Sequence, residues 1–206
     1  MKKKSRKLIL VRNDLLEQVA KITAKEGRTF FSFTNEVFEQ AIEAYNMHVT
    51  LAEALEFYKM MNIGKNLRCL LVPYDVFNHM TKKLFTIERE KLLEKWYESG
   101  LWNGSYLSMK FHNQNPLKVV QSFMKTSIWS LDEFSIDANK EKIDVKCFSP
   151  HLTLECTEML AKFLKGMFNS LGYTIKSNTC LRGIIMMELE SKRNEVKSEL
   201  FVDVKS

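Results

Sequence analysis

The chain has 206 residues, of which 45% are hydrophobic and 11% aromatic. This composition provides enough apolar surface for a packed core and excludes an intrinsically disordered chain. The 7 glycines and 3 prolines argue against long flexible linkers. No apolar run reaches the roughly 18 residues of a membrane span, and the first apolar run, Leu8–Val11, is too short for a signal peptide. We therefore expect a cytoplasmic protein with no membrane association.

The net charge of +6 is concentrated in one short segment. Five positive charges and no acid lie in this basic segment, at Lys2, Lys3, Lys4, Arg6 and Lys7. Such a segment can contact phosphates and release counterions. The alternative is a solvated segment that only aids solubility. Because it directly precedes the candidate DNA-binding strand described below, we favour phosphate contact.

The four cysteines lie mostly inside apolar runs and form no C-x-x-C pair, which indicates free thiols in a reducing compartment. Cys147, His151 and Cys156 come within one ten-residue window at a predicted strand-to-helix turn. This is a weak candidate for a metal site, which needs clustered ligands. We prefer the interpretation of two core cysteines and one exposed histidine, and we predict no metal and no cofactor.

None of the common catalytic or phosphate-binding motifs occurs in the sequence. We find no P-loop, no dinucleotide-binding glycine pattern, no H-E-x-x-H and no nucleophile elbow. The carboxylates are spread along solvent-facing positions. We therefore expect no enzymatic activity.

Residues 7–47 predict a strand, a helix, a turn and a second helix. Leu8–Val11 has the apolar, partly branched composition of a strand. Asn13 or Asp14 is expected to cap the following helix, and Gly27 is expected to end it. The apolar stripe of this first helix consists of Leu15, Leu16, Val19 and Ile22.

The second helix begins near Thr29, a plausible N-cap. One face gathers large apolar side chains: Phe30, Phe33, Val37, Phe38, Ala41, Ile42 and Tyr45. The preceding strand of four or five residues is not stable alone, and no partner strand follows nearby. The strand therefore needs a partner from another chain.

This strand-helix-turn-helix order resembles the ribbon-helix-helix family of DNA-binding dimers, with a close match in the spacing from Leu15-Leu16 to Gly27-Arg28. The resemblance implies a homodimer in which Leu8–Val11 pairs with the same strand of a second copy and the helices of residues 15–46 complete the interface. It covers residues 7–47, and we call residues 1–48 the head.

The resemblance also implies how the head would contact DNA. The paired strands lie in the major groove, where Ile9 and Val11 occupy ribbon positions. Backbone N–H groups at Arg28 and Thr29 hold phosphate at the start of the second helix. A ribbon that reads bases alternates polar and apolar side chains, but both faces of Leu8–Val11 are apolar. Either the head binds DNA mainly through phosphate, or the strand is buried on both faces and the head only dimerises.

The middle of the chain predicts helices at residues 50–63, 74–85 and 88–98, with Pro73 opening the second. Leu67–Val72 is a short apolar run between the first two. Gly100–Ser105 contains two glycines and predicts a domain boundary.

Beyond this boundary the pattern alternates between strands and helices. The predicted elements are strand Tyr106–Phe111, helix Pro116–Lys125, a hairpin of Glu133–Asp137 and Lys142–Phe148, helix Cys156–Leu171 and strand Gly183–Leu189. This β-α-β-β-α-β order resembles ferredoxin-like domains. We therefore expect an α+β protein.

The predicted organisation is a head at 1–48, a helical connector at 49–104, a ferredoxin-like domain at 105–190 and a charged tail at 191–206. It indicates a homodimeric DNA-binding transcriptional regulator whose C-terminal domain senses an unidentified small molecule or oligomerises. The alternative is a non-enzymatic interaction or scaffold protein whose head only dimerises.

Overall fold

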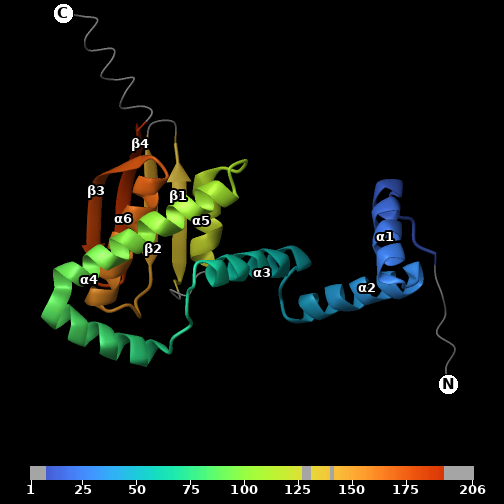
Figure 1. Ribbon diagram of the computed structural model, residues 1–206, viewed down its shortest axis with the longest axis horizontal. Helices are drawn as coiled ribbons and strands as arrows, with labels where there is room; N and C mark the ends of the chain where they lie inside the picture. The colour runs from blue at the N-terminus through green and yellow to red at the C-terminus, as the bar shows by residue number, and fades with distance from the viewer. Residues whose placement is uncertain (1–7, 127–130, 140–141, 193–206) are drawn as a thin grey trace, which may run out of the picture. The chain divides into compact units, whose positions relative to one another are not determined.

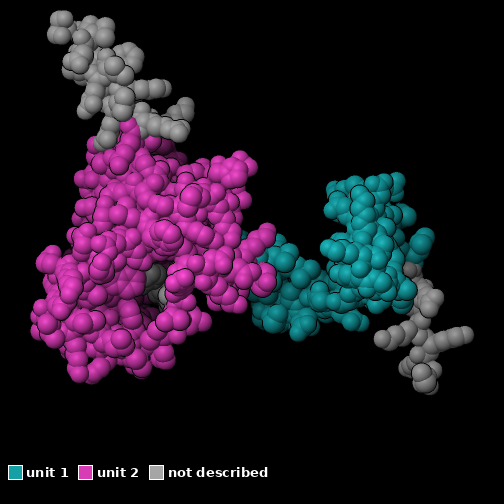
Figure 2. All heavy atoms as spheres, viewed as in Figure 1, with its two compact units in different colours: residues 1–56 teal, residues 57–206 magenta. Residues whose placement is uncertain are grey.

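The computed structural model describes residues 8–126, 131–139 and 142–192 (Figure 1). Within these residues the protein is α+β, with six helices and one four-stranded antiparallel sheet. The chain divides into two compact units, Met1–Glu56 and Phe57–Ser206, which we call unit 1 and unit 2 (Figure 2). The basic segment and most of the predicted tail lie outside the described residues.

Unit 1 contains α1 (Asn13–Glu26), α2 (Phe30–Asn46) and the start of α3 (Leu51–Asn66). The predicted end of the first helix is confirmed, because Gly27 has a left-handed φ of 65° and its N–H donates to the Thr23 carbonyl. The predicted cap of the second helix is also confirmed, since Thr29 Oγ1 accepts a hydrogen bond from the Ser32 N–H at 3.1 Å.

The predicted cap of the first helix is wrong. Helix α1 already includes Asn13 and Asp14, and the extended residue before it is Arg12, whose side chain makes no cap hydrogen bond. Asp14 instead accepts from the Arg12 guanidinium at 2.9 Å. Leu8–Val11 is irregular in the single chain, as expected for a segment whose predicted strand partner is a second copy. That pairing stays a prediction.

Unit 2 is built on a sheet with the strand order β1-β2-β4-β3. Its strands are β1 (Glu133–Ala138), β2 (Ile143–Phe148), β3 (Tyr173–Leu181) and β4 (Ile184–Ser191). Every adjacent pair is antiparallel. The predicted hairpin is confirmed as β1 and β2, and the predicted last strand is confirmed as β4. Strand β3 was not predicted.

Two of the predicted helices pack on this sheet as α5 (Pro116–Lys125) and α6 (Leu154–Ser170) (Figure 1). Successive side chains of β2 point to opposite faces of the sheet, so Val145 and Cys147 are buried while Lys146 and Phe148 are exposed. Strand β4 contributes Ile185, Met187 and Leu189 to the same core. Helix α6 adds a continuous apolar stripe, and the resulting core belongs to unit 2.

The long helix α4 (Tyr74–Lys110) corrects two predictions. Residues 106–110, predicted as the start of a strand ending at Phe111, form the last turns of α4. Gly100–Ser105, predicted as a boundary, is helical as well. The predicted break between the helices at 74–85 and 88–98 appears instead as a kink at Glu88, with φ −135° and ψ 44°.

The glycines of α4 serve close helix packing. A Cβ atom on Gly100 would lie 2.0 Å from the Phe163 carbonyl oxygen of α6. A Cβ atom on Gly166 of α6 would lie 2.1 Å from the Tyr97 carbonyl oxygen of α4. Only residues without side chains allow the two backbones to approach this closely. The glycine-rich segment therefore marks a helix–helix contact within unit 2.

The element order also differs from the predicted one. After α4, the described chain runs α5-β1-β2-α6-β3-β4, so the β-α-β-β-α-β order of a ferredoxin-like domain is not observed. Helix α3 also continues through Gly64 to Asn66, because a single glycine within a helix is tolerated.

Candidate nucleic-acid interface

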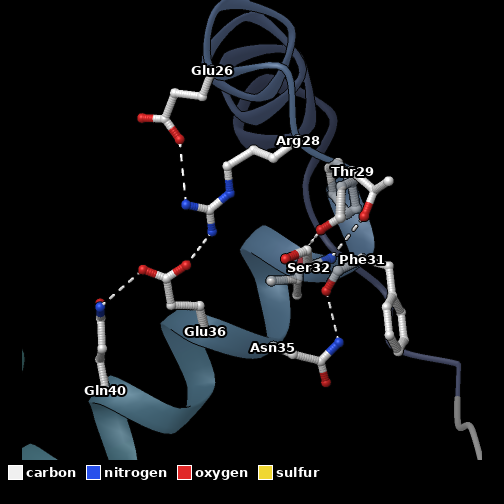
Figure 3. A network of polar contacts seen from close by, with 10 residues as sticks. Glu26, Arg28, Thr29, Phe31, Ser32, Asn35, Glu36 and Gln40 are labelled. Carbon is white, nitrogen blue, oxygen red and sulfur yellow. Dashed lines mark hydrogen bonds and ion pairs between the residues drawn. The ribbon is translucent and has the colours of Figure 1, made fainter.

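The turn between α1 and α2 holds Arg28 in a network of polar contacts (Figure 3). Its Nη1 lies 3.4 Å from Glu26 Oε2, and its Nη2 pairs with Glu36 Oε2. The guanidinium carbon lies 5.1 Å from the centroid of the Phe33 ring. Glu36 also accepts a hydrogen bond from Gln40 Nε2 at 3.2 Å. Arg28 therefore connects the end of α1 to the first turns of α2.

This network changes what Arg28 can do as a predicted phosphate contact. The two carboxylates compensate the positive charge of the Arg28 guanidinium. A phosphate would have to displace Glu36 or Glu26 from Arg28, and both carboxylates would repel it. Arg28 thus has a structural role in the head, and it is less available to a phosphate than an unpaired cation would be.

The start of α2 carries the partial positive charge of a helix end. No acidic residue lies in its first turn, so the partial positive charge of the helix end is not neutralised there. Thr29 already satisfies the Ser32 N–H, and Asn35 Nδ2 donates to the Phe31 carbonyl at 2.7 Å. The predicted position of Thr29 at the helix start is therefore correct, while phosphate contact there stays a prediction.

The ribbon positions Ile9 and Val11 are 59% and 42% exposed in the single chain, and Leu8 and Leu10 are more than nine-tenths exposed. Both alternating sets are accessible, and neither carries a side-chain hydrogen-bond donor or acceptor. Base edges are recognised largely by such donors and acceptors. These four side chains are therefore suited to burial against protein, and recognition of DNA would depend on the backbone phosphates.

The head has almost no core of its own. Among its described residues only Thr23 and Ala44 are buried. Large apolar side chains remain exposed along both helices: Leu15, Ile22, Phe30, Phe31, Val37, Phe38, Ile42 and Tyr45. Soluble monomers rarely expose contiguous apolar surface on this scale, and such surfaces mark interaction sites.

The weak metal candidate of the sequence is not assembled in unit 2. Cys147 is buried in β2, Cys156 is buried in α6 and His151 is exposed in the loop between them. Burial raises the pKa of Cys147 to about 12, so the thiol stays protonated at neutral pH and is a poor ligand. Cys156 instead donates to Asn78 Oδ1 at 3.2 Å. Over residues 8–126, 131–139 and 142–192, no three His, Cys, Asp or Glu side chains could hold a metal ion.

Unit 2 contains a groove that the sequence did not predict. It has a volume of about 650 Å³ and lies where the ends of α4, α6 and β4 meet the start of α5. Polar and apolar side chains line it in similar measure, the polar ones being Ser108, His112, Gln114, Ser170, Ser191 and Lys192. No sequence motif joins these residues, because they come from separate segments that only the fold brings together.

Comparison with known proteins identified no relative of this chain. No family model matches the chain, and neither a curated protein nor a solved structure matches it. Within the described part of the chain, no helix has both the length and the hydropathy that crossing a membrane would require.

Proposed function

We propose that the protein is a cytoplasmic, homodimeric DNA-binding protein that acts in transcription regulation. The observation that carries this proposal is the exposed apolar surface of the head, in which only Thr23 and Ala44 of the described residues are buried. The proposed role is binding, with no catalytic step.

The head needs a partner for energetic reasons. Helix α1 has 14 residues and α2 has 17, and most of the stability of helices in proteins comes from packing of their apolar faces. Their apolar stripes gain stability only when they are removed from water. A second copy presents the same surface, so an isologous two-fold contact buries both stripes together. Leu8–Val11 would pair with its own copy in this dimer.

DNA binding in this proposal depends mainly on the basic segment. Its five cations are the strongest concentration of positive charge in the chain, whereas Arg28 is paired with two carboxylates. Contacts of this kind hold phosphate without reading sequence. We therefore expect an affinity that falls steeply with salt and depends little on base sequence.

Fluorescence anisotropy with a labelled duplex, measured between about 50 and 200 mM salt, tests this proposal. Replacing Lys2, Lys3 and Lys4 by Gln should lower the slope of log K against log salt by about 3 and weaken binding at every salt concentration. Lys118, Lys125 and Lys165, exposed on unit 2, replaced together by Gln, make the matched control and should leave the slope unchanged. Absence of binding by the wild type at 50 mM salt would refute the DNA-binding part.

A second candidate function is a dimeric interaction protein whose head does not bind DNA. The two carboxylates around Arg28 and the apolar character of both faces of Leu8–Val11 favour it. Sedimentation equilibrium tests the dimer directly. Phe38→Glu, in the exposed apolar stripe of α2, should give a monomer. Gln18→Glu, on the exposed surface of α1, adds the same charge and should leave the dimer intact. A dimer without DNA binding at low salt would select this second function.

Unit 2 is the part to which the proposal assigns effector sensing or oligomerisation. The groove at the end of α4 has the size of a small-molecule site. Its mixed polar and apolar lining suits a small molecule that carries both kinds of group. Carbene footprinting of Ser108 and His112, with and without a candidate effector, would show protection if the groove binds it and none if the groove is unused.

A further inference from the structure

The first half of α4, residues 74–87, is held on unit 2 by its inner side. Phe77 packs edge-to-face on Trp96, with ring centroids 6.3 Å apart. Thr81 is buried, and Phe85 packs against the core. The Tyr74 hydroxyl donates to the His151 carbonyl. These contacts fix which side of the helix faces away from unit 2.

A second side of the same helix segment is apolar and exposed. Val76, Met80, Leu84 and Ile87 are 50%, 54%, 44% and 76% exposed. They are spaced by four, four and three residues, which places them along one line of a helix. The apolar segment before the helix extends this surface with Leu70, Leu71 and Val72, which are 76%, 73% and 46% exposed. We call these seven residues the outer face.

The outer face is larger than the scattered apolar side chains of an ordinary surface. Each of its seven members exposes roughly half of its surface or more, which amounts to several hundred Å² of exposed apolar area. Two copies of such a face would bury on the order of 1,000 Å², the size at which specific protein–protein interfaces begin. The outer face is therefore large enough to form a specific interface with a second copy of itself.

The residue spacing of the outer face is compatible with pairing of two identical copies of this face. Val76 and Leu84 lie at equal distances on either side of Met80. In two antiparallel helices that cross at Met80, Val76 of one copy therefore lies opposite Leu84 of the other. Ile87 then meets the Val72 end of the second copy. The four side chains of the line are uncharged, but Lys83 lies beside Val76 and Ile87 on the helix, three residues from the crossing point. Self-pairing must therefore keep the two Lys83 ammonium groups at the solvent-exposed edge of the contact.

Two other partners fit less well. Membrane-surface helices present many lysines and arginines beside their apolar face, whereas residues 74–87 contain only Lys82 and Lys83. Nucleic acid would need a continuous basic surface, which this segment also lacks. A neutral apolar line with a symmetric spacing is best matched by an identical line.

We propose that the outer face of α4 binds the same face of a second copy of this chain, with the two helices antiparallel and Met80 on the two-fold axis. This contact is separate from the proposed pairing of the heads. If the heads also pair, they hold the second copy at high effective concentration and strengthen the contact.

Disulfide trapping in the full chain tests the geometry. In a background with Cys69→Ser and Cys180→Ser, Met80→Cys should form a covalent dimer under mild oxidation, because residues on the axis come within the roughly 7 Å that a disulfide spans. Ile87→Cys is the matched control on the same face. It lies seven residues from the axis, so its two copies are about 20 Å apart in antiparallel helices and should not cross-link. Equal cross-linking at both positions, or none at Met80, would overturn the proposal.

A head variant separates this contact from the proposed function. With Phe38→Glu added, the Met80→Cys dimer should still form at raised protein concentration, because the outer face lies outside the head. Adding Leu84→Glu to Met80→Cys should abolish it, whereas adding His79→Glu, on the exposed side between Asp75 and Lys83, should not. If adding Phe38→Glu to Met80→Cys abolished the cross-link at every protein concentration, α4 would make no contact of its own. That result would refute this proposal without affecting the proposed head dimer.

Discussion

Helices α2 and α6 make the two units directly comparable. Both have 17 residues, and both begin at a threonine whose side chain accepts a hydrogen bond from the N–H three residues later. Ten residues of α6 are buried, whereas one residue of α2, Ala44, is buried. Local sequence signals of similar quality therefore lead to very different degrees of packing.

The difference lies in what each helix packs against. Helix α6 has α4 on one side and the sheet on the other, and its stripe enters a continuous core. Within residues 8–126, 131–139 and 142–192, the main helix contact of α2 is with α1, and large apolar side chains of both remain exposed. Most helical stability in proteins comes from packing of the apolar face. Unit 2 contains that packing within itself, and in the proposed function the head obtains it from a second copy.

The largest expected effect comes from breaking the core contact of unit 2. Gly166→Ala places a Cβ atom 2.1 Å from the Tyr97 carbonyl oxygen and 2.9 Å from the Leu101 nitrogen. Because both atoms are backbone, α4 and α6 must separate. We expect a loss of about 3 kcal/mol or more in the free energy of unfolding of unit 2, measured by urea denaturation monitored by tryptophan fluorescence.

The control is a helical glycine with free space. A Cβ atom on Gly64 of α3 would lie 3.9 Å from the Cys69 Cβ, an ordinary contact. Gly64→Ala should therefore leave stability unchanged or raise it by about 0.5–1 kcal/mol. Similar losses for the two variants would contradict the packing role of Gly166.

The next largest effect is a dependence of stability on protein concentration, which we expect for the head and not for unit 2. If the head folds only as a dimer, each tenfold dilution lowers its apparent stability by about 1.4 kcal/mol. Hydrogen-exchange mass spectrometry should show that residues 30–46 lose protection on dilution, while residues 154–170 do not change. Equal protection of residues 30–46 at all concentrations would mean that the head is stable in a single chain.

The sequence predicted elements whose signals are local. The apolar stripes predicted α2 and α6, Thr29 was identified as a cap, and the alternation around Val145 and Cys147 predicted β2. Strand β3 was missed because its centre, Ser177 to Thr179, is polar and exposed at the sheet edge. Residues 106–111 were mistaken for a strand because the contact of α4 with α6, which holds this helix, joins residues more than sixty positions apart.

The candidate site shows the same limit. Arg28 was recognised from its place after Gly27, but its pairing with Glu36 was not predicted. Glu36 is eight residues away in the sequence and meets Arg28 because Arg28 lies just before α2, beside the first turns of that helix. The groove around His112 was missed for a related reason, since its walls come from separate elements.

Cys147 should give unit 2 a dependence on alkaline pH. Burial raises its pKa from 9.0 to about 12, so the folded state holds the thiol proton more tightly than the unfolded state. The contribution of the protonated Cys147 thiol to the free energy of unfolding is fully present below pH 9. It is lost as pH rises towards 12, by at most about 1.4 kcal/mol per pH unit. Urea denaturation of Cys147→Ala should show a shallower loss between pH 9 and 11 than the wild type. Parallel pH curves would contradict this prediction.

The smallest expected effect comes from removing the threonine cap of α2 or of α6. Thr29→Ala and Thr153→Ala each remove the acceptor of one N–H group, at Ser32 and Cys156, and each should cost about 1 kcal/mol. In α6 that loss is small beside the buried stripe, so exchange of residues 154–170 should change little. In α2 it is large beside the little packing that a single head provides, so residues 30–46 should exchange much faster at low protein concentration. Thr→Ser at either position keeps the hydroxyl acceptor and should restore protection. If both alanine variants loosened their helices equally, the contrast between a self-sufficient unit 2 and a partner-dependent head would be wrong.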